Sequence, residues 1–223
     1  MNGAPLSVAS PRGIGGKRVL LVMLAIVAVA AIPAVVVPAV FARQKPPALE
    51  DLGLIPKFSL IDERGHAFTD EALKGHPTIV SFIFTRCDTI CPVTTAQMRR
   101  VQDQTVDAGA TIKLVSLSVD PNYDTPERLS QYAERFGADP QRWRFLTGPA
   151  SAVQTLVEGG FMTSMQREPD RPNGVPNIAH GGYFVLVDGA LHIRGTYGSS
   201  DPQRLNQLMA DARYLARTTR NGG

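Results

Sequence analysis

The stretch that most constrains the fold is residues 78–92, in which the apolar run TIVSFIF leads directly into TRCDTICP. A nearly continuous run of β-branched and aromatic residues is typical of a strand that is buried on both faces. The only two cysteines of the chain, Cys87 and Cys91, follow that run with three residues between them, and a helical pattern comes after them. The sequence therefore predicts a cysteine pair at the point where a buried strand passes into a helix.

Strands and helices alternate over residues 57–217, the range expected for the folded domain. This alternation, with a hairpin and a helix at the end, predicts an α/β fold with a mixed central sheet, parallel in the middle and antiparallel at one edge. The cysteine pair narrows the fold to a thioredoxin-like arrangement, although the spacing is C-x-x-x-C rather than C-x-x-C. Strands are expected at residues 58–61, 67–69, 78–84, 112–119, 143–146, 183–187 and 191–196. Helices are expected at residues 93–108, 126–137, 150–158 and 202–216.

Residues 19–42 form an uncharged run of 24 residues, long enough to cross a bilayer core that needs about 20 helical residues. Lys17 and Arg18 precede it, so the positive-inside tendency predicts a transmembrane helix with a cytoplasmic N-terminus and an exported remainder. The alternative is a cleaved signal peptide that ends at residues 40–42. In either case the domain faces a compartment where disulfides persist, and the predicted location is the cell inner membrane with a periplasmic domain. The remaining segments are a basic leader at residues 1–18, a stem linker at 43–56 and a flexible tail at 218–223.

The distribution of charge argues against a nucleic-acid partner. The chain has 23 lysines and arginines and 20 aspartates and glutamates, and three of the basic residues, Arg12, Lys17 and Arg18, lie in the leader. The other basic residues only balance the acidic ones. The folded part therefore lacks the basic surplus that typifies nucleic-acid binding.

Four roles can be considered for Cys87 and Cys91: a structural staple, a redox pair, a metal clamp or two inert buried thiols. A disulfide between these residues would close a very short loop and constrain little of the unfolded chain, which argues against a staple. Thiols beside a helix N-terminus become thiolates more readily, because that end is positively polarised. Residues i and i+4 of a helix share one face, where two sulfurs can form a disulfide or hold one ion. Redox and metal roles therefore both remain open.

A soft metal held by two thiolates needs a further donor, and imidazole is a suitable one. If the first hairpin strand runs antiparallel beside the strand that leads into Cys87, its start lies near the cysteines. This pairing places His180 beside Cys87 and His192 about 20 Å away along the ladder. Strand pairing therefore selects His180. The other two histidines, His66 and His76, are expected to be ordinary surface residues in loops.

Further motifs carry a resemblance to a known family. They are FSLIDERG, TIVSFIFTRCDTICP, LSVDPNYDTPERL, FLTG and the histidine that precedes YFVLVDG. Over residues 54–215 the chain resembles the Sco/SenC family of membrane-anchored, thioredoxin-like copper proteins, which help to assemble the dinuclear copper centre of cytochrome c oxidase. The resemblance implies that Cys87, Cys91 and His180 are the ligands of one copper ion, Cu(I) or Cu(II). It also implies that the partner is the copper-centre subunit of the oxidase.

The chain departs from the family pattern beside the histidine. Family members commonly carry an aspartate before it and often a serine or threonine after it, whereas this chain has Ala179 and Gly181. An acidic neighbour that could orient the ligand is therefore missing at that place.

Four other residues have simpler interpretations than a functional one. Asp120 and Asp124 match the family's S-V-D-P-x-x-D-T-P stretch, and turn formation and helix capping account for both. Met162 and Met165 could offer thioethers to Cu(I), but packing in the core or in a loop is the better interpretation.

Two functional classes remain open. The first is a copper chaperone that holds the ion at Cys87, Cys91 and His180 and passes it to the oxidase subunit, with other periplasmic copper chaperones or thiol reductants as further partners. The second is a periplasmic thiol-disulfide oxidoreductase that uses Cys87 and Cys91 without obligatory copper. Zinc, with water as a fourth ligand, would also suit the three residues. Dependence on His180 distinguishes the two classes.

Overall fold

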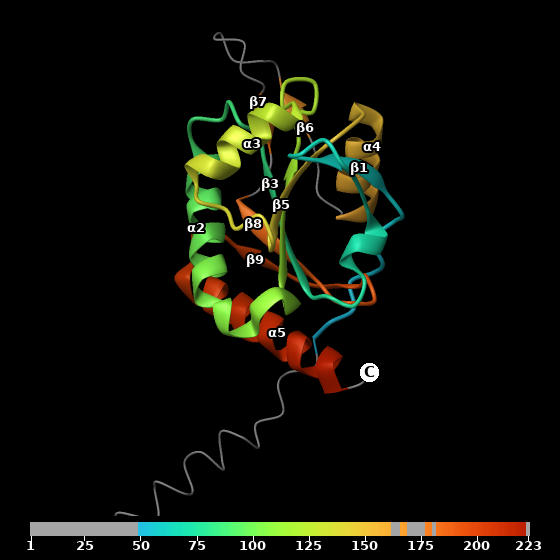
Figure 1. The fold of residues 1–223 in the computed structure, drawn as a ribbon, viewed down its shortest axis with the longest axis vertical. Coiled ribbons are helices and arrows are strands. Elements are labelled where there is room, and N and C mark those ends of the chain that lie inside the picture. Colours follow the sequence, from blue (N-terminus) through green and yellow to red (C-terminus); the bar gives the residue numbers. More distant parts are fainter. Residues whose placement is uncertain (1–48, 162–165, 169–176, 180–181, 222–223) are drawn as a thin grey trace, which may run out of the picture. The chain divides into compact units, whose positions relative to one another are not determined.

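A computed structural model describes residues 49–161, 166–168, 177–179 and 182–221, which Figure 1 draws in colour. The predicted anchor at residues 19–42 lies outside the described residues, as do His180, Met162 and Met165. Within the described part of the chain, no helix combines the length and the apolar character that crossing a membrane requires.

Seven strands form one sheet at the centre of the fold. They are β1 (Ser59–Asp62), β2 (Ala67–Thr69), β3 (Thr78–Ile83), β4 (Lys113–Ser118), β5 (Trp143–Thr147), β8 (Tyr183–Val187) and β9 (Ile193–Gly198). Their order across the sheet is β2-β1-β5-β4-β3-β8-β9. β3, β4 and β5 run parallel, and β8 and β9 add an antiparallel edge beside β3, as predicted. The prediction of only one antiparallel edge is wrong, because β1 pairs antiparallel with β5 and with β2 at the opposite side.

Helices cover both faces of this sheet. Figure 1 shows two of them, α2 (Ile90–Gln104) and α3 (Pro126–Arg135), to the left of the sheet and a third, α4 (Ala150–Gln154), to its right. The last helix, α5 (Pro202–Asn221), packs against α2 and β9. The remaining elements are 3-10 helices at Asp70–Leu73 and Val106–Thr111, a π-helix at Thr155–Gly160, and the separate pair β6 (Gln166–Glu168) and β7 (Asn177–Ala179).

Three helices end earlier than predicted. α3 ends at Arg135 rather than at residue 137. α2 ends at Gln104 rather than at residue 108, because Thr105 turns its hydroxyl back onto the carbonyl of Val101 (2.7 Å) and the chain tightens into a 3-10 helix. α4 ends at Gln154, and the wider π-helix carries the chain to Gly160.

The core is built around β3, whose six residues are all buried. Its one central polar side chain, Ser81, is satisfied because its hydroxyl lies 2.8 Å from the hydroxyl of Ser116 on β4. The indole nitrogen of Trp143 on β5 donates to the same Ser116 hydroxyl (3.0 Å), and the indole stacks on Phe145. Buried polar groups that are paired in this way cost little, so three parallel strands are held in one register.

The folded unit begins before residue 57, the predicted start of the domain. The compact unit starts at Leu49. The amides of Leu52 and Ile55 donate to the carbonyls of Ile193 (2.9 Å) and Leu191 (3.0 Å) beside β9. The Ile55 side chain is only 2% exposed. Residues 49–56 therefore belong to the domain rather than to a linker.

The C-terminal end also differs from the expected flexible tail after residue 217. α5 continues to Asn221. The hydroxyls of Thr218 and Thr219 both donate to the carbonyl of Leu215 (2.9 Å each), which satisfies a carbonyl near the helix end.

Candidate metal centre

The cysteines lie where β3 passes into α2, as predicted. After β3 the chain turns sharply, with the amide of Cys87 donating to the carbonyl of Phe84 (3.2 Å). α2 then begins at Ile90, so Cys91 lies in its first turn and Cys87 just before it. Pro92 fits this turn because its missing amide hydrogen would have no partner within the helix.

The two thiols are close together but not equivalent. The backbone amide of Cys91 donates to the sulfur of Cys87 (3.4 Å), and the two cysteines are not joined in a disulfide. Cys91 is fully buried, whereas Cys87 is 7% exposed. A hydrogen bond to Cys87 and burial both raise the pKa of Cys91. An amide at a helix N-terminus stabilises negative charge on the Cys87 sulfur, so the outer cysteine is the one placed to react first.

Asp124 lies beneath the cysteine loop and is fully buried. Its carboxylate accepts hydrogen bonds from the amide (3.1 Å) and hydroxyl (2.5 Å) of Thr85 and from the hydroxyl of Ser118 (2.5 Å). Burial raises the pKa of Asp124, against the opposing effect of these hydrogen bonds. The predicted cap of α3 was Asp124 or Thr125, and it is Thr125, whose hydroxyl accepts from the amide of Arg128.

Asp120 holds the same loop one residue further along. Its carboxylate accepts from the Nε of Arg86 (2.7 Å), and this hydrogen bond raises the pKa of Arg86. The amides of Tyr123 and Asp124 donate to the carbonyl of Asp120 (3.0 and 2.9 Å), so the turn after β4 is closed by its own backbone. The turn after β4 therefore fixes the two residues directly before Cys87.

This role of Asp120 and Asp124 was missed at the sequence level. β3 and β4 are parallel neighbours, so the loops at their carboxyl ends meet at one edge of the sheet. Polar residues that follow two adjacent parallel strands are therefore the signal that could have brought the aspartates and the cysteines together.

The inner cysteine is tied to α3. The hydroxyl of Thr95 donates to the carbonyl of Cys91 (2.8 Å) and lies 2.9 Å from the hydroxyl of Tyr132. Burial raises the pKa of Tyr132, so its hydroxyl stays protonated. The first turn of α2 is thus supported from both sides, by the turn after β4 and by α3.

The described histidines lie away from the thiols. His192 lies beside the β8–β9 turn, with its Nδ1 2.9 Å from Asp51. The two others contact Asp62 (His66, 3.9 Å) and the carbonyl of Thr111 (His76, 3.3 Å). No group of three histidine, cysteine or acidic residues suitable for a metal occurs among the described residues. A third ligand would come from outside them, where His180 lies.

β8 runs in the direction that the choice of His180 assumed. It pairs antiparallel with β3, with Ser81 opposite Phe184, so it starts where β3 ends. The chain just before β8 is fixed there, because Gly182 accepts a hydrogen bond from the amide of Ser199 (2.7 Å). A side chain at Gly182 would lie only 3.1 Å from Ile90, the first residue of α2.

Comparison with known proteins identifies the family that has this arrangement. The family model for SCO1/SenC matches residues 47–215, most of the chain. The chain belongs to the SCO1/SenC family. Membership confirms the predicted family and the thioredoxin-like fold of this Sco protein.

Three similar proteins illustrate the membership. A Stutzerimonas stutzeri protein named for copper binding is 33% identical to this Sco protein over 165 residues, which cover 70% of this chain and 77% of that protein. A SCO1/SenC family lipoprotein from Bacillus anthracis has a crystal structure that covers 75% of this chain and 98% of its own, with 27% identity and a TM-score of 0.67. BsSco, a member of the Sco family of cytochrome c oxidase assembly proteins with a disulfide switch, covers 75% and 96%, with 26% identity and a TM-score of 0.65.

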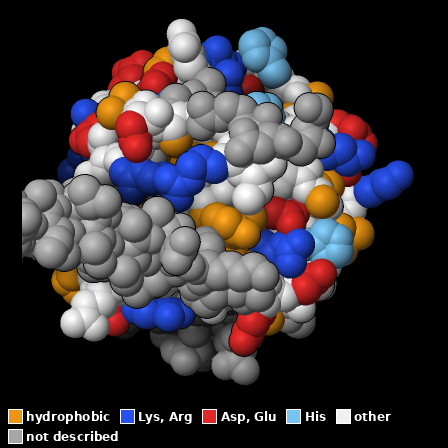
Figure 2. All heavy atoms as spheres, turned by 90° about the horizontal axis from the view of Figure 1, so that it is seen from below, with side chains coloured by type: hydrophobic (Ala, Val, Ile, Leu, Met, Phe, Trp, Pro, Cys, Tyr) orange, Lys and Arg blue, Asp and Glu red, His pale blue; other side chains and the backbone are white. Residues whose placement is uncertain are grey.

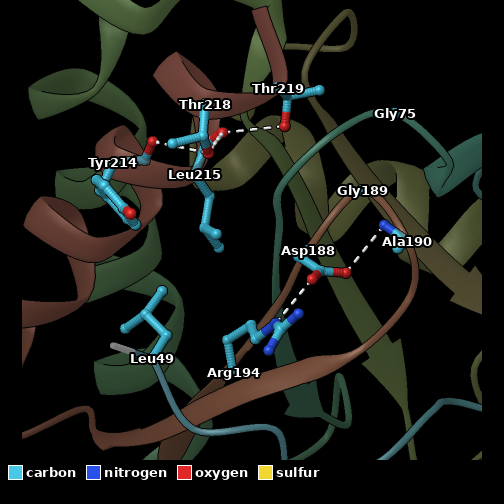
Figure 3. Close-up of a pocket in the computed structure, with 10 residues that line it drawn as sticks. All are labelled: Leu49, Gly75, Asp188, Gly189, Ala190, Arg194, Tyr214, Leu215, Thr218 and Thr219. Carbon is cyan, nitrogen blue, oxygen red and sulfur yellow. Dashed lines mark hydrogen bonds and ion pairs between the residues drawn. The ribbon is translucent and has the colours of Figure 1, made fainter. Parts of the chain in front are cut away.

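A pocket of about 550 Å³ lies at the end of the Sco domain opposite the cysteines and takes no part in the cysteine centre. Figure 3 shows it between the β8–β9 turn and the end of α5, with Leu49 at its rim and Asp188 paired with Arg194. Its threonines, Thr218 and Thr219, bond to their own helix. Figure 2 shows this end of the molecule, where acidic and basic side chains are interspersed.

The cysteine centre suits a soft metal ion. Cys87 and Cys91 offer two sulfurs in a mostly buried setting, and soft thiolates favour Cu(I). Burial also keeps water and oxidants away from Cys91.

Proposed function

We propose that this Sco protein is a copper chaperone that binds one copper ion at Cys87, Cys91 and His180 and delivers it to the dinuclear copper centre of cytochrome c oxidase. The observation that carries the proposal is the pair of buried thiols at the start of α2, in which the Cys91 amide lies 3.4 Å from the Cys87 sulfur. A relative named for copper binding and another from a family of oxidase assembly proteins support this role.

The chain next to His180 supports it as the third ligand. Gly182 lies two residues after His180, and a side chain there would contact Ile90, the neighbour of Cys91. Consecutive Cα atoms are about 3.8 Å apart, so the Cα of His180 lies no more than about 8 Å from that of Gly182. An imidazole tethered this close to the start of α2 could reach the thiols and complete a three-coordinate centre.

Copper binding and the redox state of the cysteines are coupled in this proposal. Copper is bound by thiolates, so loading requires both cysteines to be reduced. Oxidation of Cys87 and Cys91 to a disulfide gives up two electrons and removes two ligands at once, so the ion leaves. The same pair could pass those electrons to a disulfide in the oxidase copper centre and prepare it for copper.

The proposal includes the membrane anchor at residues 19–42, with the N-terminus in the cytoplasm and the domain in the periplasm. The uncharged run and the two cations before it support this placement. The acceptor copper centre would then face the same compartment. Protease treatment of spheroplasts should cleave the domain while the inner membrane stays intact.

The test is copper stoichiometry of the reduced full-length chain in detergent, read together with thiolate-to-copper absorption. The wild type should bind one copper ion. His180→Ala should weaken copper binding at least tenfold, since a ligand is worth no less than the supporting groups that orient it. His192→Ala is the matched control, because His192 is paired with Asp51 away from the cysteines.

Equal copper affinities of the two histidine variants would contradict the three-ligand centre. Full reduction of a partner disulfide without copper, unchanged in His180→Ala, would instead favour a thiol-disulfide oxidoreductase.

A further inference from the structure

A second pocket, of about 350 Å³, opens beside the cysteine loop. It lies between the turns after β3 and β4 and the exposed side of α3, and we call it the arginine pocket. Its lining includes three guanidinium groups, from Arg86, Arg128 and Arg135, and two phenols, from Tyr123 and Tyr132, but no carboxylate. The pocket is therefore positively charged in a chain whose folded part is otherwise balanced.

Two of the guanidinium groups are held in place. Arg86 and Arg128 lie 4.5 Å and 3.9 Å from the ring centre of Tyr123, which stacks with both. Arg128 also donates to the carbonyl of Tyr123 (2.6 Å), and Arg86 is paired with Asp120 (2.7 Å). Cation–π contacts and hydrogen bonds fix these cations before any partner arrives, which lowers the entropy lost on binding.

The spacing of residues on α3 keeps negative charge out of the pocket. Arg128, Tyr132 and Arg135 recur at intervals of four and three residues, so they share one face of the helix. The two glutamates of α3, Glu127 and Glu134, each stand one residue away from an arginine and are not among the lining residues.

The arginine pocket is continuous with the cysteine centre. Arg86 directly precedes Cys87 in the loop. At the base of the pocket, Tyr132 contacts the hydroxyl of Thr95, which donates to the carbonyl of Cys91. A group seated in the pocket is therefore in contact with residues that support both thiols.

We propose that the arginine pocket is the docking surface for an acidic segment of the copper-accepting subunit of cytochrome c oxidase. This inference rests on the proposed function, since it adds the chemistry of the partner. Carboxylates of the partner would pair with Arg128 and Arg135, and arginine forks suit carboxylates well. Docking there brings the acceptor's own ligands beside Cys87, so that copper can pass between sulfurs without release into solvent.

The test measures the affinity between the full-length chain in detergent and the copper-centre subunit of the oxidase. Both proteins are reduced and copper-free, and the affinity is measured by calorimetry at low and at physiological salt. The double variant Arg128→Gln/Arg135→Gln should weaken binding about tenfold at low salt, as expected for loss of close charge pairs. The matched control is Arg213→Gln/Arg217→Gln on α5, which removes the same charge and should change the affinity less than about twofold. Arg135→Gln alone keeps the Arg128–Tyr123 stack and should show a smaller loss.

Equal affinities for the two double variants would overturn the docking surface, and so would a wild-type protein that fails to bind the subunit. Copper transfer is measured separately with the same proteins. Tight, arginine-dependent binding without copper transfer would refute the chaperone role and leave the docking surface standing. If copper is transferred but the Arg128→Gln/Arg135→Gln variant binds the subunit as tightly as the wild type does, the docking surface is refuted and the chaperone role stands.

Discussion

Replacing Asp124 probes how the cysteine loop is held. Alanine at this position leaves three donors without an acceptor: the amide and hydroxyl of Thr85 and the hydroxyl of Ser118. A donor that stays buried and unpaired costs about 1–3 kcal/mol. Ser118 is fully buried and Thr85 is only partly exposed, so water has little access to these donors. The variant no longer has to bury a carboxyl, and this gain offsets part of the cost of the unpaired donors. We therefore expect the free energy of unfolding to fall by about 2–4 kcal/mol.

Urea unfolding of reduced residues 43–223 measures this loss, because the compact unit starts at Leu49. Asp211→Ala is the matched control, since Asp211 is also buried and accepts from the hydroxyl of Tyr197 (2.7 Å) on the α5 side of the domain. Both variants should lose stability, but only Asp124→Ala loosens the residues before Cys87. Alkylation of Cys87 by iodoacetamide should therefore become several times faster in Asp124→Ala and stay unchanged in Asp211→Ala.

A stability loss of less than about 1 kcal/mol for Asp124→Ala would refute the view that its carboxylate is a main support of the loop. Equal alkylation rates in the two variants would show that the support does not reach Cys87.

The same carboxyl should give stability a definite pH dependence. Burial raises the pKa of Asp124, so over a range of pH the folded chain holds a proton on this carboxyl that the unfolded chain has released. Lowering the pH from about 7 to about 4 should therefore stabilise the wild type relative to Asp124→Asn. Parallel urea-unfolding curves at every pH would contradict this. Ile55→Ala should cost about 2–4 kcal/mol of stability, because that side chain is only 2% exposed, whereas a linker residue would cost nothing measurable by the same assay. Thr95→Val keeps the size but removes the hydroxyl between Cys91 and Tyr132, and should lower the thermal unfolding midpoint by several degrees, about 1–2 kcal/mol; an unchanged midpoint would show that the link is dispensable.

The sequence predicted those elements whose side-chain pattern shows which residues are buried. The run at residues 78–84 predicted a strand buried on both faces, and β3 is such a strand. The antiparallel direction of β8, on which the choice of His180 depends, is confirmed by the pairing of Ser81 with Phe184. The predicted ligands Cys87 and Cys91 lie together, and His180 remains a prediction.

Other features could not be predicted because they leave no side-chain pattern. Residues 49–56 join β9 through backbone hydrogen bonds, which any sequence can make, and their acidic residues and Pro56 resemble a linker. Asp124 stands in a turn where capping is the common role of aspartate, and only the packing of two neighbouring loops turns its side chain inward. Local patterns carry no information on such contacts between distant segments.

The chain enters the described domain at the end of the sheet opposite its thiols. Leu49 lies with Gly75 and Gly189 at the start of β3, and Cys87 follows the end of that strand. Six strand residues at about 3.3 Å each make the sheet a rigid arm of about 20 Å between the two ends. Under the proposed anchoring, a tether that joins the domain at Leu49 would attach at the base of that arm, with the sulfurs at its tip. Lengthening the segment before Leu49 would widen the area that the tip can sweep.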